Sequence, residues 1–393
     1  MLIRYGKEQN GKLIKKAIVY VPAEHKINFA DVDGDAVFIT GRLRANGYES
    51  YIVGGAVRDL ILGKKPKDFD IVTDATPARI KRIFRNSRII GRRFRLVHVF
   101  FGEKIFEVST FRSLKDGHTG NTYGSIEEDV LRRDFSFNAL LYDPGKQLVV
   151  DYVNGMNDVR KKILRPLIPE NLIFTDDPVR MIRAVKYAAA GGFSIPRRLR
   201  KRIKKEANLL AGISPSRLTE ELAKIIRSPD VPQIIESLEE AGLYCYLQNE
   251  ASELMKKNPS FRNAYLAGFK SLALNEPARG QPMAALFRAY LELQTPWEEL
   301  KKSSWEKYKA VFTDIRRFIL PMNPPKTELE QAIRLCFSEH GIDVKKIRTM
   351  EKERQLAHRG RLQARSASAE EQRKSVRKRK PRKKPAAEEK SPE

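Results

Sequence analysis

The stretch YIVGGAVRDLILGKKPKDFDIV, residues 51–72, is the part of the chain from which its fold is best inferred. An apolar, strand-like run ends at Gly54 and Gly55, and a short helix is predicted over residues 56–62. Backbone amides at a helix start favour an anion, and glycine lets phosphates approach closely. Arg58, in the first turn, is expected to pair with phosphate oxygens. The competing interpretation is an ordinary turn.

Two carboxylates follow in the sequence DFD, where Asp68 and Asp70 are expected to lie on one strand. Side chains alternate along a strand, so both should face the same side. Paired acids in an apolar strand suit Mg²⁺, which takes oxygen ligands from protein and from substrate phosphates. Glu107 is the predicted third metal ligand if its strand lies beside DFDIV. A solvated strand end and an edge-facing glutamate are the alternatives.

Further polar residues suggest a nucleotide site. Arg112 is a candidate phosphate ligand, and RRDFSFNAL contributes Arg133, Asp134 and Asn138 as candidate ribose and phosphate contacts. Asp134 is also counted among the predicted catalytic residues. A structural ion pair between Asp134 and the neighbouring arginines is the other interpretation of this segment.

The DDPVR segment pairs an acceptor with a donor. Asp177 and Arg180 are three residues apart, so on a helix they would share one face. A carboxylate accepts and a guanidinium donates hydrogen bonds, which matches the amino group and ring nitrogen of adenine or cytosine. An intrahelical salt bridge is the alternative interpretation.

Composition points to a polyanionic partner. The 393 residues carry a formal net charge of +26, which favours nucleic acid ahead of an anionic membrane. Only Cys245 and Cys336 are present, so neither a disulfide framework nor a zinc pattern is possible, and a cytoplasmic location is expected. No apolar run approaches the ~20 residues of a membrane span, so no membrane insertion is expected. We expect a monomer.

The order of local patterns predicts an α+β protein with five segments. Residues 1–26 are a weakly specified extension, and residues 27–152 alternate strands and helices in a sheet-containing head. Residues 153–228 form a helical neck and residues 229–342 a helical body. Residues 343–393 are basic and proline-containing, without aromatic residues, and are expected to be disordered.

The tail contains a dense cationic block that we predict to bind RNA. Without aromatic side chains it cannot stack on bases, so phosphate neutralisation is the expected contribution. A merely solubilising tail is the alternative. The block consists of Arg377, Lys378, Arg379, Lys380, Arg382, Lys383 and Lys384.

Taken together, GGAVRDLILGKKPKDFD, TFR, RRDFSFNAL and DDPVRMIRAVKYA resemble, in this order, the motifs of class II nucleotidyltransferases. These are the tRNA CCA-adding enzymes and the bacterial poly(A) polymerases. The resemblance implies a polymerase β-like nucleotidyltransferase head followed by a helical neck and body. It assigns the metal to Asp68 and Asp70, and ribose selection to the polar residues of RRDFSFN. Base reading falls to Asp176, Asp177 and Arg180, with Asp where the family usually has Glu.

The segment FRNSRIIGRRFRLVHVFFG, residues 84–102, is similar to a signature of the bacterial poly(A) polymerases. The chain has no His-Asp dipeptide, which argues against the phosphohydrolase domain of some CCA-adding enzymes. The resemblance therefore implies template-independent transfer of AMP from ATP to RNA 3′ ends, with Mg²⁺ and release of pyrophosphate. A tRNA CCA-adding enzyme is the first alternative, and a non-catalytic RNA-binding protein on the same fold is the second.

Overall fold

The computed structural model describes most of the chain, and contacts divide it into two compact units. One comprises Met1–Pro277 with Phe318–Pro324, and the other Ala278–Arg317 with Pro325–Glu393. This division is coarser than the five predicted segments, whose boundaries stay predictions. The described residues are 2–7, 13–91, 95–115, 117, 122–273, 280–295, 297, 305–346, 348, 349, 353 and 356.

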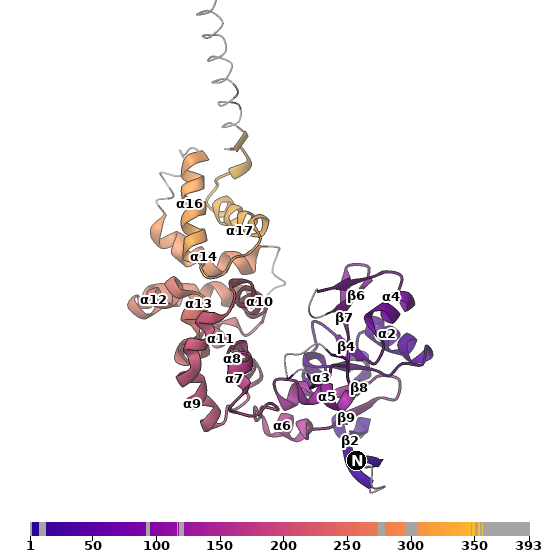
Figure 1. Cartoon of the computed structure of the whole chain (residues 1–393). Coiled ribbons are helices and arrows are strands. Elements are labelled where there is room, and N and C mark those ends of the chain that lie inside the picture. Colours follow the sequence, from indigo (N-terminus) through magenta and orange to yellow (C-terminus); the bar gives the residue numbers. More distant parts are fainter. Residues whose placement is uncertain are drawn as a thin grey trace, which may run out of the picture. The chain divides into compact units, whose positions relative to one another are not determined.

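Within the described residues, nine strands of the first unit form one mixed sheet (Figure 1). They are β1 (Leu2–Lys7), β2 (Leu13–Tyr20), β3 (Ser50–Val53), β4 (Asp70–Thr73), β5 (Ser87–Ile90), β6 (Leu96–Phe101), β7 (Lys104–Thr110), β8 (Leu141–Asp143) and β9 (Leu148–Asp151). The spatial order is β1-β2-β9-β8-β3-β4-β7-β6-β5. β3 pairs antiparallel with β4, whereas β4 and β7 run parallel. The glycines and aspartates of the quoted stretch therefore lie at the middle of the sheet.

The stretches RLVHVFFG and KIFEVSTF, on either side of the turn at Gly102, predict a β-hairpin, and the structure confirms it. β6 and β7 pair antiparallel from Leu96 opposite Ser109 to Phe101 opposite Lys104. Gly102 has φ +57°, a left-handed conformation that glycine adopts without the steric cost of a Cβ atom. The hairpin carries β7 back into the sheet beside β4.

Short helices accompany the strands of the head. They are α1 (Pro22–His25), α2 (Gly34–Ala45), α3 (Gly55–Ile61), α4 (Pro77–Ile83) and α5 (Ile126–Leu131). Tyr51, Val53 and Val72 pack with Ile126 and Val130 of α5 in one buried cluster. α2 and α4 contact the central strands as well. β3 is buried along its whole length, so the backbone around the glycine turn is firmly held.

The N-terminal residues differ from the sequence prediction. Residues 1–26 were expected to form a weakly specified extension, yet β1 and β2 pair with each other and β2 pairs with β9. Ala17 and Tyr20 are buried. The partner strand β9 lies more than a hundred residues away in the sequence, so no local pattern indicated this pairing.

The described chain after β9 is helical, which confirms the predicted α+β class with a sheet-containing head followed by helices (Figure 1). No helix in the described ranges combines the length and the apolar character needed to cross a membrane. After β9, the α-helices of the first unit are α6 (Gly155–Lys161), α7 (Ile173–Asp176), α8 (Val179–Gly191), α9 (Arg197–Glu206), α10 (Pro215–Ile226), α11 (Val231–Glu240), α12 (Asn249–Lys257) and α13 (Pro259–Ala273).

In the second unit, the described residues form three further long helices. They are α14 (Gln281–Gln294), α16 (Trp305–Phe318, whose last residue falls in the first unit) and α17 (Lys326–Glu339). Beyond α17, residues 344–346 are helical and Val344 is buried. An unfolded tail was expected from Asp343 onward, and this apolar side chain extends the fold slightly further.

Candidate active site

The glycine turn and the second aspartate of DFD come together through strand pairing. β3 ends at Val53, which lies opposite Asp70 on β4. Gly54 follows with φ +77°, and α3 begins at Gly55. A Cβ atom on Gly54 would lie 3.8 Å from Oδ2 of Asp70. The predicted phosphate-binding turn is therefore adjacent to a predicted metal ligand.

The two aspartates face the same way, but only one of them is on a strand. β4 begins at Asp70, so Asp68 precedes the strand that was expected to contain both. Both residues are exposed and Phe69 between them is buried. The side chains therefore alternate between exposed and buried as predicted for a strand, although Asp68 lies outside β4.

The third predicted acid lies beside them. β4 pairs in parallel with β7 so that Ile71 is level with Val108, which places Asp70 level with Glu107. Neighbours in register on adjacent strands share a face of the sheet. The condition set for Glu107, a strand beside DFDIV, is met by this topology.

The pKa of the Asp70 carboxyl reflects the charged residues that surround it. Desolvation by surrounding protein raises the pKa of the Asp70 carboxyl to about 6, and the negative charges of Glu107 and Asp68 act in the same direction. Arg133 and Lys224 oppose this shift. Asp70 nevertheless has exposed surface, so the desolvation arises from protein packed around an open site. Such repulsion between carboxylates is relieved by a cation.

The carboxylates are not arranged as a ready-made metal cage. In the described parts of the chain, no group of three or more His, Cys, Asp or Glu side chains is placed to hold a metal ion. Glu107 is half exposed, with its Oε1 3.5 Å from Nε2 of His98. A hard divalent cation still fits Asp68 and Asp70, because such an ion completes its shell with water and substrate phosphates.

Arg58 connects the glycine turn to the predicted ribose motif. Its guanidinium donates to Oδ1 of Asn138 at 3.0 Å. It also lies over the rings of Tyr187 and Phe137, 5.0 and 5.9 Å from their centroids. The candidate phosphate ligand and the candidate ribose ligand therefore belong to one cluster.

Arg112 and Arg133 surround an acid that the sequence analysis did not single out. Nη2 of Arg133 donates to Oδ2 of Asp129 at 2.9 Å, and the Arg112 backbone amide donates to its Oδ1 at 3.2 Å. Burial lowers the pKa of Arg112, and Asp129 acts against that shift. In the sequence, the only sign of a role for Asp129 was its place next to Val130 in the short helical segment IEEDVL.

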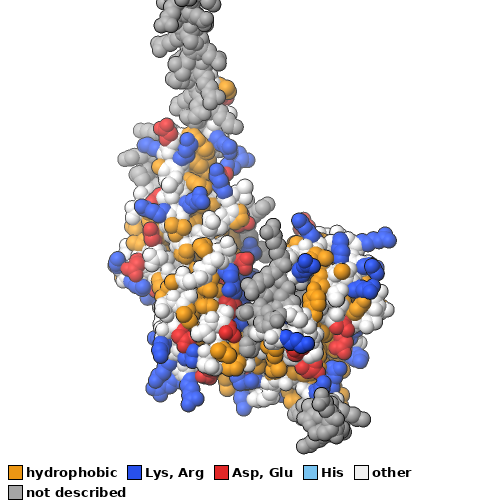
Figure 2. Space-filling view, viewed as in Figure 1, with side chains coloured by type: hydrophobic (Ala, Val, Ile, Leu, Met, Phe, Trp, Pro, Cys, Tyr) orange, Lys and Arg blue, Asp and Glu red, His pale blue; other side chains and the backbone are white. Residues whose placement is uncertain are grey.

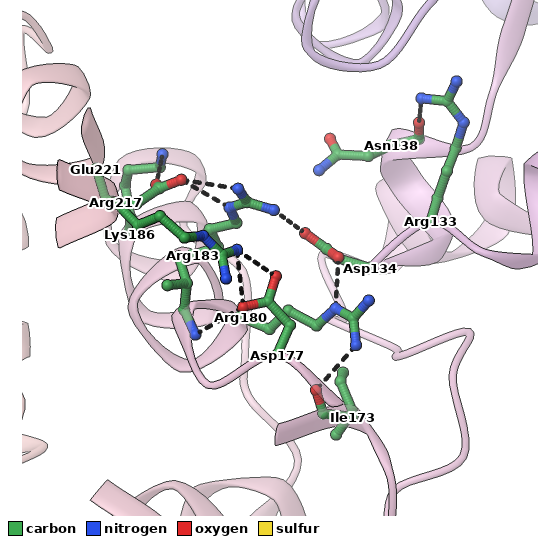
Figure 3. A network of polar contacts seen from close by, with 11 residues as sticks. Arg133, Asp134, Asn138, Ile173, Asp177, Arg180, Arg183, Lys186, Arg217 and Glu221 are labelled. Carbon is green, nitrogen blue, oxygen red and sulfur yellow. Dashed lines mark hydrogen bonds and ion pairs between the residues drawn. The ribbon is translucent and has the colours of Figure 1, made fainter. Parts of the chain in front are cut away.

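Asp134 joins the head to the neck (Figure 3). Its Oδ1 accepts from Nε of Arg180 at 2.8 Å, and its Oδ2 accepts from Nη1 of Arg183 at 2.9 Å. The structural ion-pair interpretation predicted the neighbouring arginines as partners, whereas the ion pairs observed run to α8. Both carboxylate oxygens are engaged, which favours a positioning role over direct contact with reacting atoms.

Asp177 and Arg180 do not form the intrahelical salt bridge that was the alternative interpretation. Asp177 caps α7 in an extended conformation, and α8 begins only at Val179. Both oxygens of Asp177 accept from Nη2 of Arg217, at 2.9 and 2.8 Å, while Arg180 pairs with Asp134. Both residues of the predicted pair are buried. Pro178 disfavours helical backbone at Asp177, so Asp177 lies between α7 and α8 and not on the helix that was predicted to carry both residues.

Arg183 and Glu221 are the polar residues that the sequence analysis missed here. Arg183 donates through Nε to Glu221 at 2.9 Å, and Lys186 lies 3.3 Å from the same carboxylate. Burial disfavours charge on Arg183, but Asp134 and Glu221 outweigh it and raise its pKa. The available signal was the position of Glu221 on the apolar face of α10.

The predicted RNA-binding block in the tail, residues 377–384, lies outside the described residues. Nothing in the structure tests it.

Comparisons with known proteins support the nucleotidyltransferase fold. Residues 50–165 match the family model "Poly A polymerase head domain", and residues 192–255 match "Probable RNA and SrmB- binding site of polymerase A". A solved Bacillus stearothermophilus CCA-adding enzyme in complex with CTP superposes with a TM-score of 0.54 at 28% identity, over 79% of this chain and 83% of that one.

Sequence relatives include both branches. The chain is 41% identical over 245 residues to "Poly(A) polymerase I" of Escherichia coli O157:H7, which covers 58% of this chain and 53% of that protein. It is 35% identical over 240 residues to the "CCA-adding enzyme" of Geobacillus thermodenitrificans, 59% of each chain. The chain spans about half the length of the curated relatives it matches.

Proposed function

We propose that this chain, which matches the poly A polymerase head domain over residues 50–165 and a probable RNA-binding site of polymerase A over residues 192–255, transfers AMP from ATP to RNA 3′ ends without a template. The observation that carries the proposal is the position of Asp70, which lies opposite Val53, beside the Gly54 turn, and level with Glu107. Phosphate-binding backbone and metal-binding carboxylates are thereby within one nucleotide's reach.

The triphosphate would dock at the turn formed by Gly54 and Gly55, with Arg58 as its charge partner. Asp68 and Asp70, with Glu107 nearby, would hold Mg²⁺. When bound, the ion supplies Lewis-acid activation of the RNA 3′-hydroxyl and neutralises the departing pyrophosphate. The RNA 3′-hydroxyl gives up its proton to solvent, its oxygen bonds to the α-phosphorus, and the bond from the α-phosphorus to the α–β bridging oxygen breaks to release pyrophosphate.

The neck supplies base selection in this proposal. Asp177 and Arg180 provide an acceptor and a donor that match the edge of adenine. Both are buried and already paired, Asp177 with Arg217 and Arg180 with Asp134, so the base would have to share or replace these contacts. The cluster of Arg58 with Asn138, next to Arg133, supports contacts to ribose and phosphate. Asp134 of the head forms ion pairs with Arg180 and Arg183 of the neck, so the residues proposed for base selection are positioned by contacts to the head.

We predict that Arg180→Ala lowers the preference for ATP over the other nucleotides roughly tenfold or more, because the selecting donor is lost. The measurement is competitive incorporation, since a ratio of products does not depend on how much protein is folded. Arg183→Ala is the matched control, because Arg183 shares Asp134 as partner. An equal loss of preference in both variants would show that Arg180 acts only by positioning.

One incubation tests the proposal as a whole. Purified protein is mixed with an RNA primer, Mg²⁺ and each nucleotide separately, with chelator as control. Long adenylate extensions from ATP alone are expected, and chelation should abolish them. Addition of C, C and A only to tRNA-like ends would establish the CCA-adding alternative. No incorporation with any nucleotide would favour the non-catalytic RNA-binding alternative.

We also propose that the protein is a cytoplasmic monomer.

A further inference from the structure

Helix α9 is the most one-sided charged element among the described residues. Its sequence RRLRKRIKKE contains seven cations and one acid. Figure 2 shows Lys and Arg side chains gathered where Figure 1 places α9. The cations are Arg197, Arg198, Arg200, Lys201, Arg202, Lys204 and Lys205. Only Arg202 forms an ion pair with a described residue, with Glu206 at 2.6 Å.

This arrangement is unfavourable for the helix itself. Arg197 and Arg198 lie at the N-terminus, where the helix dipole disfavours positive charge. Like charges four residues apart repel, as Arg197 and Lys201 do here. The helix is held by Leu199 and Ile203, which are buried in the protein. A helix whose charges oppose its own stability is best explained by an anionic ligand.

We propose that α9 is a binding site for the phosphate backbone of the RNA substrate, through the exposed cations opposite Leu199 and Ile203. At a rise of about 1.5 Å per residue the helix is about 15 Å long, enough to contact several phosphates of one strand. It has no aromatic residue on which bases stack, so the contact is independent of sequence. The inference rests on the proposed RNA substrate and adds a site within the matched RNA-binding segment.

The structure favours RNA over an anionic membrane at this surface. A helix that lies on a membrane inserts its apolar residues into the lipid boundary. The apolar residues of α9, Leu199 and Ile203, are 0% and 1% exposed and pack inside the protein. Only cationic and polar groups remain to face a ligand.

The test compares two variants that remove the same charge. One is Arg197→Gln, Lys201→Gln and Lys204→Gln together, in which none of the wild-type cations has an ion pair with a described residue. The other is the control triple Lys256→Gln, Lys257→Gln and Arg262→Gln. In the control each cation is paired, with Glu253 for the lysines and Glu236 for the arginine.

Binding is measured across a salt series, without ATP or Mg²⁺, for an oligoadenylate and for an RNA of unrelated sequence. The α9 variant should lose affinity for both RNAs by the same factor, on the order of tenfold. Its slope of log affinity against log salt should fall by about 2, since each lost phosphate contact accounts for about 0.7. The control should keep the wild-type slope. Binding needs no catalysis, so failure here is distinguishable from failure of the proposed transfer activity.

A second readout separates a ligand site from a structural one. Thermal unfolding of the free α9 variant should occur at or above the wild-type temperature, because repulsion is relieved. Lower stability or loss of folding would contradict the premise. An unchanged RNA slope, an equal loss in the control, or lost binding to phosphatidylglycerol vesicles with intact RNA binding would each overturn the proposal.

Discussion

At the scale of single residues, the backbone conformation of Gly54 explains why a glycine stands at the candidate site. Gly54 adopts φ +77°, a conformation that side chains other than glycine rarely adopt. An added Cβ would make ordinary van der Waals contact with Oδ2 of Asp70 at 3.8 Å and with Nη1 of Arg133 at 3.9 Å, so the turn lies directly beside these charged groups. The backbone conformation is therefore what requires glycine at this position, and a side chain there would face the charged site.

We predict that Gly54→Ala destabilises the fold by about 1 kcal/mol and lowers transfer activity further than this loss of stability explains. The control is Gly63→Ala, which has a similar φ of +69° but nothing within 4 Å of its Cβ position. Unfolding and nucleotide incorporation are measured for both. Equal activity of the two folded variants would contradict a role for Gly54 in the site.

Asp70 is the residue on which the proposed chemistry depends most. We predict that Asp70→Ala lowers AMP transfer by about a thousandfold or more, because a metal ligand contributes several kcal/mol to transition-state stabilisation. Asp68→Ala should act in the same direction. Asp74→Ala, an exposed acid just after the same strand, is the control. Near-normal incorporation by Asp70→Ala would refute the metal assignment.

Among the elements, α8 and α10 are joined by a buried ionic network. Glu221 of α10 is 2% exposed and accepts from Arg183 and Lys186 of α8. Burial disfavours the Glu221 carboxylate, but Arg183, Lys186 and Lys224 outweigh it and lower its pKa below the ordinary value of 4.5. Removing one partner of such a network leaves buried charge uncompensated.

Glu221→Gln should destabilise the protein by about 3–5 kcal/mol at neutral pH, because Arg183 and Lys186 lose their counter-charge. Since folding depresses the pKa of this carboxyl, its contribution is complete above 4.5 and disappears as pH falls through the folded-state pKa. Chemical denaturation from neutral to acidic pH measures the difference. Glu220→Gln, exposed on the same helix, is the control. A difference that does not shrink in acid would contradict the assignment.

For the whole molecule, the net charge of +26 is shared between the residues that the structure describes and the C-terminal segment beyond them. α9 contributes one dense cluster, and residues 377–384 contain another. Each cluster is proposed to contact phosphates and not bases, and each can be removed without changing the other, so the two proposals are tested separately.

Truncation after Leu356 should weaken RNA binding without altering ATP selectivity, since base selection is assigned to the neck. If the seven cations of the block are the removed residues that contact phosphates, the salt slope should fall by up to about 5, at about 0.7 each. A chain of full length in which these seven residues are Gln is the control for length. Identical slopes for truncated and intact protein would show that the tail does not contact RNA.

The amino-acid sequence by itself determined the features that depend on neighbouring residues. The strand ending at Gly54, the helix after it and the hairpin at Gly102 follow from alternation, turn chemistry and helix signals, all of which are local. The same holds for the alternation of Asp68 and Asp70 around Phe69. These features, together with the order of motifs, were enough to indicate the nucleotidyltransferase head.

Only the tertiary structure decided which distant groups meet. The parallel register of β4 and β7 places Glu107 beside Asp70, and helix packing gives Asp177 to Arg217 and Asp134 to Arg180. From the sequence alone, each of these acidic side chains has many arginines and lysines that could equally well be its partner. The choice among them is made by strand register and helix packing, which bring together residues far apart in the chain and leave no local pattern.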